Sequence, residues 1–158
     1  MSGKIILAVA ACVCVMAMPG WAQDTNPAPA APRPVPPYGT PITLEQAKTA
    51  VAAAEAEAKR MGVVPTLAVV EPSGEIVLLE KGTGTSYGTA EVALEKARSA
   101  ARFRAPTANF DNTRALPPGM VSGLGGIPIV VDGRIIGAIG TAGAPGDSMA
   151  KAAVAAVH

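Results

Sequence analysis

Two hairpin patterns, separated by one long amphipathic stretch, most constrain how this chain can fold. Each is a pair of β-rich runs joined by turn residues, Pro72-Ser73-Gly74 in the first and Asp132-Gly133 in the second. The runs are Thr66–Glu71 with Glu75–Lys81, and Ile127–Val131 with Arg134–Ile139. Because a tight turn joins neighbouring strands only in opposite directions, these runs predict an antiparallel sheet of at least four strands.

A helix is expected before the first hairpin. Its apolar residues recur at three- and four-residue spacing up to Met61, which places them on one face. Thr43 and Gln46 have the spacing of a capping box at its start, and Gly62 is a C-terminal cap. These signals bound the helix at both ends.

Two further helices are expected downstream. One runs from about Ser86 to Phe103, and the other starts near Asp147, which can cap it, and continues to the chain end. A short helical turn is expected within Thr107–Leu116. The order helix, hairpin, helix, hairpin, helix predicts a single α/β domain over Ile42–His158, with helices flanking an antiparallel sheet.

The N-terminal region has the pattern of an exported precursor. Residues 1–22 combine Lys4, an apolar run too short for a membrane-spanning helix, and a small-residue end at Ala22, as secretory signals do. Residues 23–41 contain seven prolines and few large apolar side chains, which predicts a disordered linker. We therefore expect an exported protein, either periplasmic or secreted.

Charge and residue types exclude several functions. The 13 Lys and Arg residues balance 12 Asp and Glu residues without a basic stripe, so nucleic acid is not an expected partner. Both cysteines, Cys12 and Cys14, fall within the expected signal, and the one histidine is His158. The exported chain therefore cannot build a histidine-based triad or a multi-histidine metal site within one copy.

The second expected helix carries a charge pattern with two interpretations. Attractive pairs at three- and four-residue spacing are typical of a solvated surface. The residues in this pattern are Glu91, Glu95, Arg98 and Arg102. Alternatively, Arg98, Arg102 or Arg104 binds the propionates or phosphates of an anionic ligand.

Seven glycines cluster around the second hairpin, where they allow the backbone to approach a ligand or another subunit closely. They are Gly123, Gly125, Gly126, Gly137, Gly140, Gly143 and Gly146. The run Gly137–Gly143 lacks the Gly-Lys-Ser/Thr ending and the spacing of a phosphate loop, so nucleotide binding is not expected.

Five motifs occur in a characteristic order between Ile42 and His158. They are Val69-Val70-Glu71-Pro72-Ser73-Gly74, Ala93–Ala97, Ala105-Pro106-Thr107, Gly125-Gly126-Ile127-Pro128-Ile129 and Gly133–Ala144. In this order they resemble the GlcG/HbpS family, also called haem-degrading or DUF336 domains. The Gly-Gly-x-Pro and Ile-Gly-Ala-Ile-Gly-x-x-Gly patterns occur at the family's spacing.

The resemblance implies a profilin-like α/β fold, assembly into homo-oligomers and, in secreted members, haem binding. The precursor is similar to that secreted branch, whose segment like Ala105-Pro106-Thr107 carries a threonine near the haem iron. It thus implies that Thr107 contacts haem and its iron. Further haem-binding candidates are Arg98, Arg102, Phe103 and Arg104. Thr107 also has an alternative interpretation as a helix N-cap.

Two positions depart from the family pattern. Glu71 stands where the family commonly has aspartate, and Asp147 stands alone where the family has an acidic pair. Three functions stay open: an exported oligomeric haem- or tetrapyrrole-binding protein in haem or iron handling or redox sensing, a haem-degrading enzyme, and a non-catalytic accessory module for a membrane sensor protein. No catalytic residue is assigned.

Overall fold

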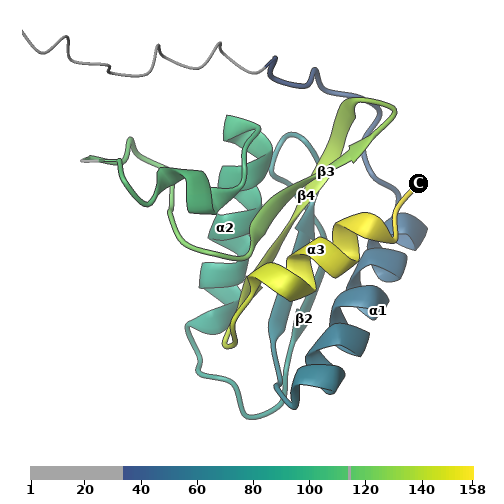
Figure 1. The fold of residues 1–158 in the computed structure, drawn as a ribbon, viewed down its shortest axis with the longest axis vertical. Coiled ribbons are helices and arrows are strands. Elements are labelled where there is room, and N and C mark those ends of the chain that lie inside the picture. Colours follow the sequence, from purple (N-terminus) through teal and green to yellow (C-terminus); the bar gives the residue numbers. More distant parts are fainter. Residues whose placement is uncertain (1–33, 114) are drawn as a thin grey trace, which may run out of the picture. The chain divides into compact units, whose positions relative to one another are not determined.

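The computed structural model describes residues 34–113 and 115–158, drawn as a coloured ribbon in Figure 1. The signal predicted over 1–22 and the first part of the predicted linker lie outside the described residues. The elements in chain order are α1 (Leu44–Met61), β1 (Thr66–Val70), β2 (Ile76–Lys81), α2 (Thr89–Phe103), the 3-10 helix η1 (Thr107–Phe110), β3 (Gly126–Val131), β4 (Arg134–Ala142) and α3 (Asp147–Ala155). The predicted order of helices and hairpins is confirmed.

The strands form one antiparallel sheet in the order β2-β1-β4-β3. β1 pairs with β2 and β3 pairs with β4, as the two turn sequences predict. Asp132 and Gly133 in the second turn have positive φ angles of 49° and 71°, as a two-residue type I′ turn requires. The pairing of β1 with β4 joins the hairpins, with Thr66 opposite Ala142 and Val70 opposite Ala138.

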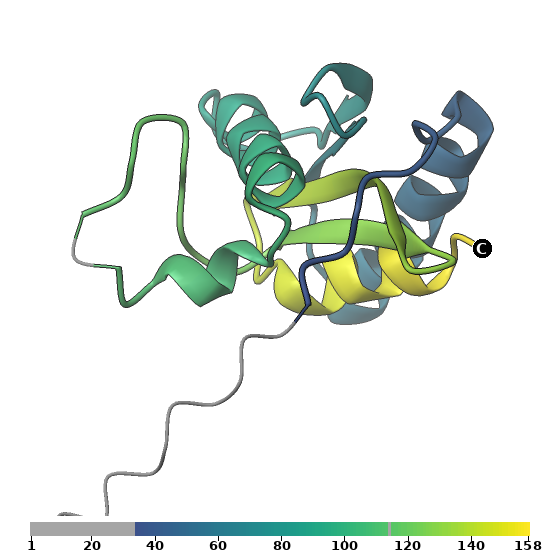
Figure 2. The same ribbon diagram turned by 90° about the horizontal axis from the view of Figure 1, so that it is seen from above.

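Helices cover both faces of this sheet. Figure 2 shows α2 on one side of β3 and β4 and α3 on the other, and α1 packs beside α3. Larger apolar side chains such as Leu67, Ile129 and Ile139 fill the side of α1 and α3. The buried residues on the α2 side are Ala68, Val70, Ala93, Ala97, Ala100, Ala101, Ala138 and Ala142. Because most of these side chains are single methyl groups, α2 lies close to the sheet.

Glycines of the second hairpin make this close packing possible. A Cβ atom on Gly140 would overlap the carbonyl oxygen of Ala93 and lie 2.6 Å from the backbone nitrogen of Ala97, both in α2. A Cβ atom on Gly146 would likewise overlap the buried side chain of Thr141. The close approach predicted at these two glycines is therefore to other parts of the same chain.

The folded unit begins before the predicted boundary at Ile42. Tyr38 forms a parallel bridge with Ile135 of β4, and its hydroxyl lies 3.1 Å from the carbonyl oxygen of Ala101 in α2, to which it donates. The disorder predicted over 23–41 is therefore wrong at the C-terminal end of that segment. Main-chain pairing and one tyrosine hydroxyl fix residues that their proline-rich composition places in a linker.

The caps of α1 and α3 differ in how well their sequence signals predict them. At α1 the capping box is confirmed, because Thr43 Oγ1 accepts from the Gln46 nitrogen at 3.2 Å and Gln46 Oε1 accepts from the Thr43 nitrogen at 3.1 Å. At α3 the predicted Asp147 cap is wrong, because Gly146 occupies the N-cap position. Asp147 lies one residue inside the helix and pairs with Lys151 at 2.5 Å instead.

Other boundaries shift by a few residues. α2 starts at Thr89 rather than Ser86, because the Thr89 hydroxyl donates to the Ser86 carbonyl at 2.8 Å and closes a turn there. η1 covers only the first four residues of the expected Thr107–Leu116 turn, and β4 continues past Ile139. None of the helices in the described part of the chain is long and apolar enough to cross a membrane.

Glu80 of β2 and Glu55 of α1 form a like-charge pair that couples stability to pH. Burial raises the pKa of Glu80, and the neighbouring Glu55 carboxylate raises the pKa further. A carboxyl group with a raised pKa in the folded state binds its proton more tightly there than in the unfolded chain. Its stabilising contribution is complete below the unfolded pKa and is lost as the pH rises through the folded pKa.

We therefore expect Glu80→Gln to raise the free energy of unfolding at pH 7. The expected gain is only about 0.3 kcal/mol, because Glu80 is exposed and solvent screens the interaction between surface charges. At pH 4 the gain should shrink, because the wild-type carboxyl is then largely protonated. Urea unfolding at the two pH values measures this, and an equal gain at both would contradict the expectation.

Candidate functional site

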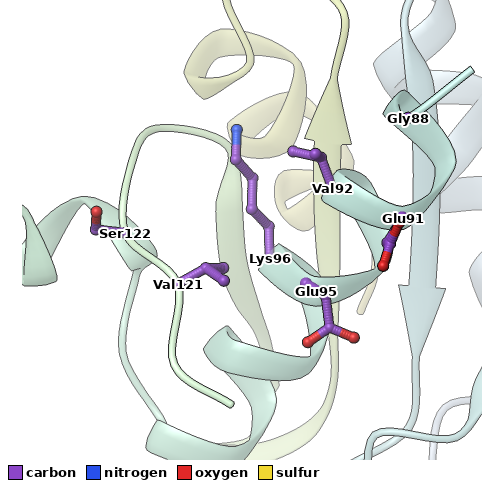
Figure 3. Close-up of a pocket in the computed structure, with 7 residues that line it drawn as sticks. All are labelled: Gly88, Glu91, Val92, Glu95, Lys96, Val121 and Ser122. Carbon is purple, nitrogen blue, oxygen red and sulfur yellow. The ribbon is translucent and has the colours of Figure 1, made fainter. Parts of the chain in front are cut away.

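A pocket lies between α2 and the loop that precedes β3 (Figure 3). Its volume is about 300 Å³, at the lower end of the range for small-molecule sites. The lining residues are Gly88, Glu91, Val92, Glu95, Lys96, Val121 and Ser122. The first five come from the N-terminal half of α2 and the residue before it, and the last two come from the loop. The pocket therefore depends on where this loop is held.

A buried serine of α2 holds the middle of the loop. The Ser99 hydroxyl accepts from the backbone nitrogen of Val121 at 2.8 Å and donates to the carbonyl oxygen of Val121 at 3.4 Å. Because Val121 lines the pocket, this reciprocal pair fixes one wall relative to the helix.

Thr107 of η1 holds the end of the same loop. It is fully buried, and its hydroxyl donates to the carbonyl oxygen of Gly123 at 2.5 Å and accepts from the backbone nitrogen of Gly126 at 3.1 Å. The N-cap interpretation of Thr107 is wrong, because Pro106 occupies the N-cap position of η1 and no side-chain capping bond forms. Thr107 does not line the pocket, and its contact with haem stays a prediction.

Lys96 is the cation among the residues that line the pocket. Its Nζ donates to the carbonyl oxygen of Leu124 at 2.8 Å and to that of Thr141 at 3.3 Å, so it joins the loop to β4. Burial lowers the pKa of Lys96, and the charge of Asp111 partly opposes this shift. The lysine thus places a partly desolvated positive charge at the pocket.

The predicted arginines of α2 point to a different part of the fold. Arg98 Nε donates to the carbonyl oxygen of Gly74 at 3.1 Å, and Arg102 Nε donates to that of Ser73 at 3.3 Å. The charge pattern predicted on this helix contains several possible ion pairs. In the described residues, one of them forms, between Arg98 and Glu95 at 3.0 Å. Arg98 and Arg102 therefore hold the turn between β1 and β2 rather than line the pocket.

Phe103 and Arg104 lie at the C-terminal end of α2. The Phe103 ring packs edge-on against Phe110, with ring centroids 6.0 Å apart, and Phe103 is 36% exposed. The Arg104 guanidinium lies 5.3 Å from the centre of the Tyr38 ring. Neither residue lines the pocket, so their predicted haem contacts stay predictions.

Sequence reasoning missed three of the residues that make this site. Lys96 counted only as part of a motif, and Val121 and Ser122 were not singled out. The contacts that bring them together span 22 residues between Ser99 and Val121 and 45 residues between Lys96 and Thr141. No local spacing pattern carries that information, because it depends on how the loop returns over α2.

The side chains of the pocket combine apolar contact with charges of both signs. Val92 and Val121 supply apolar contact, Lys96 supplies one positive charge, and Glu91 and Glu95 supply two carboxylates. In residues 34–113 and 115–158, no group of three or more His, Cys, Asp or Glu side chains is placed to hold a metal ion. The apolar side chains and the lysine match a haem group in chemical character, and Val92, Val121 and Lys96 are the residues that would hold it.

Comparisons with known proteins bear on this site. The family model "Haem degrading protein HbpS-like" matches residues 42–158. The protein GlcG of Escherichia coli (strain K12) is 33% identical over 106 residues, which cover 63% of this chain and 79% of GlcG. The crystal structure of HbpS has a TM-score of 0.70 at 31% identity and covers 76% of this chain and 92% of HbpS.

A third comparison supports the fold alone. A crystal structure of the PduOC:haem complex has a TM-score of 0.67 at 21% identity, over 75% of this chain and 96% of PduOC. The predicted antiparallel sheet with flanking helices is the architecture of these neighbours. Because the family model matches residues 42–158, which include every helix and strand from α1 to α3, the protein belongs to the HbpS-like family.

Proposed function

We propose that this protein is an exported, homo-oligomeric haem-binding protein that serves in haem or iron handling or in redox sensing. The observation that carries the proposal is the coincidence of HbpS-like family membership with a pocket that offers apolar contact and a lysine beside two glutamates. Haem, when bound, supplies a redox-active iron centre. The protein's own residues supply apolar contact, a cation and the hydrogen bonds that hold the loop wall.

The haem site in this proposal lies beside α2. Val92 and Val121 contact the macrocycle, and Ser99 and Thr107 keep the loop in place against it. A hydroxyl is a weak iron ligand, so burial of the apolar ring provides most of the affinity. The predicted roles of Thr107 at the iron, and of Arg98, Arg102, Phe103 and Arg104 as haem contacts, belong to this proposal.

A titration of ferric haem (hemin) into the purified protein tests the function. We expect a saturable shift of the Soret band, as apolar burial of the ring requires. A known haem-binding protein serves as the positive control under the same conditions, and a carboxylate-free apolar dye serves as the control for unspecific adsorption. The absence of a shifted band where the positive control binds would contradict haem binding.

A haem-degrading enzyme is the second candidate, favoured by the description of the matching family model. In that case the Soret band disappears and iron is released when peroxide or a reductant is added. An unchanged spectrum over the same time, with haem still bound, would contradict turnover. The third candidate, an accessory module for a membrane sensor protein, is supported only by the predicted linker and the alanine-rich helices.

Assembly into a homo-oligomer is part of the same proposal. Large apolar side chains near the pocket are exposed: Tyr87 is 99%, Leu124 is 51% and Val92 is 47% exposed. A second copy of the chain that covers this surface would remove them from water. We expect light scattering at micromolar concentration to give a multiple of the protomer mass, and a monomeric mass would contradict this.

Export is supported by the pattern of residues 1–22. We expect the protein recovered from the periplasm or the medium to lack residues 1–22. Mass spectrometry of the N-terminus measures this directly. An intact N-terminus in protein recovered from the cytoplasm would contradict export.

A further inference from the structure

The charges around the pocket are separated in space. Figure 3 shows the Lys96 ammonium pointing away from the carboxylates of Glu95 and Glu91, so the lining has a basic end and a carboxylate end. Arg98 already pairs with Glu95 at 3.0 Å, so the carboxylate end is partly neutralised. A ligand with one anionic end and one apolar body would therefore enter in a single orientation, with its anionic end toward Lys96.

The Lys96 ammonium has the capacity for one more partner. A lysine ammonium has three N–H donors, and two of them reach the carbonyl oxygens of Leu124 and Thr141. Both acceptors are neutral, so neither of them balances the positive charge of this half-buried group, on which the Asp111 carboxylate acts only in part. A carboxylate that accepts the third N–H would form a charge-assisted hydrogen bond in a partly desolvated place.

The arginines of α2 are less suited to this task. Arg98 and Arg102 each donate to a carbonyl oxygen in the turn between β1 and β2, and Arg104 lies against the Tyr38 ring. None of the three lines the pocket. To reach a ligand in the pocket, each would have to give up a contact that the fold already uses.

We propose that Lys96 holds a propionate of the bound macrocycle and makes the site selective for tetrapyrroles with a free carboxylate. This inference rests on the proposed haem function. It assigns the anionic end of the ligand to the N-terminal half of α2 and to a lysine, rather than to the arginines at the C-terminal half.

Two ligands test this assignment: hemin, and its dimethyl ester, in which both propionates are esterified. Variants of Lys96 and Arg102 then show whether the lysine or the arginines hold the propionate. The wild-type protein should bind hemin about tenfold more tightly than the dimethyl ester, as expected for one hydrogen bond between charged groups. Lys96→Met keeps most of the side-chain length but removes the charge. It should remove the preference, so that the variant binds hemin and the ester with equal affinity.

Arg102→Met tests the alternative arrangement, and the matched control is Lys59→Met, because Lys59 is an exposed lysine of α1 that lies outside the pocket. Both should keep the preference for hemin, and so should Lys96→Arg, which retains the charge. Visible titrations give the affinities, and circular dichroism verifies that each variant is folded. If Lys96→Met fails to fold, the comparison of the two ligands on the wild-type protein still tests the preference.

The outcomes separate this inference from the proposed function. Binding of neither ligand by the wild-type protein overturns both. Equal binding of hemin and the ester overturns the role of Lys96 while haem binding stands. A preference that survives in Lys96→Met but is lost in Arg102→Met assigns the propionate to the arginines and also overturns the inference.

Discussion

Replacing Gly140 with alanine is expected to destabilise the fold by about 3 kcal/mol, the upper part of the usual range for overpacking a core. The new methyl group would overlap the carbonyl oxygen of Ala93 and lie 2.6 Å from the backbone nitrogen of Ala97. Both atoms belong to the backbone of α2, so no side chain can rotate away to relieve the overlap. The helix must move off the sheet, which also disturbs the pocket it lines.

Urea unfolding followed by circular dichroism measures this loss. Gly88→Ala is the matched control, because no atom lies within 4 Å of the position of its new methyl group. Gly88 has a φ of −74°, so alanine is not strained there and its effect should stay within about 0.5 kcal/mol. Equal shifts of the two unfolding midpoints would show that α2 does not pack as closely on β4 as described.

Thr107→Val is expected to cost about 2 kcal/mol of stability and to weaken haem binding. Valine has nearly the same shape as threonine but cannot replace the hydroxyl that joins the Gly123 carbonyl oxygen to the Gly126 nitrogen. The buried Gly126 nitrogen and the half-buried Gly123 carbonyl oxygen would each lose a partner, and an unpaired group of this kind is costly. The loop would then hold the pocket wall less firmly, because Val121 and Ser122 directly precede Gly123.

Two further substitutions separate the hydroxyl from other effects of Thr107. Thr107→Ser keeps the hydroxyl and should retain most of the haem affinity. Thr83→Val changes an exposed threonine in the same way and should leave both stability and binding nearly unchanged. Urea unfolding and hemin titration of all three variants provide the measurements. Haem affinity in Thr107→Val equal to that of the wild type would remove Thr107 from the site.

The elements of the fold could be predicted because their signals are local. The capping box at Thr43 and the turn at Asp132-Gly133 each depend on contacts within a few residues, and both are confirmed. The prediction that Asp147 caps α3 is wrong, because Asp147 lies one residue inside the helix. There its carboxylate pairs with Lys151. The disorder predicted at the end of the linker is wrong because the Tyr38 hydroxyl donates a hydrogen bond to Ala101 of α2, 63 residues away.

The pocket lies along the N-terminal half of α2, whereas the predicted arginines and Phe103 lie toward its C-terminal end, and their haem contacts stay predictions. The charge pattern drew attention to Arg98 and Arg102, whose partners in the turn at Ser73 and Gly74 cannot be found from helix spacing. No pattern in the sequence indicates the role of Lys96, because its hydrogen-bond acceptors are carbonyl oxygens of Leu124 in the loop and Thr141 in β4. The pocket exists only where the loop packs against α2, so neither segment predicts it alone.

The order of helices and hairpins, the antiparallel sheet and the family could all be predicted from the amino-acid sequence, because periodicity, turn chemistry and motif spacing are set by neighbouring residues. Two features are visible only in the folded chain. α2 lies close against Gly140, and the loop held by Ser99 and Thr107 forms a pocket beside Lys96. The physical reason is that close packing and long-range hydrogen bonds join residues far apart in the chain. Their geometry exists only when the sheet and α2 have come together.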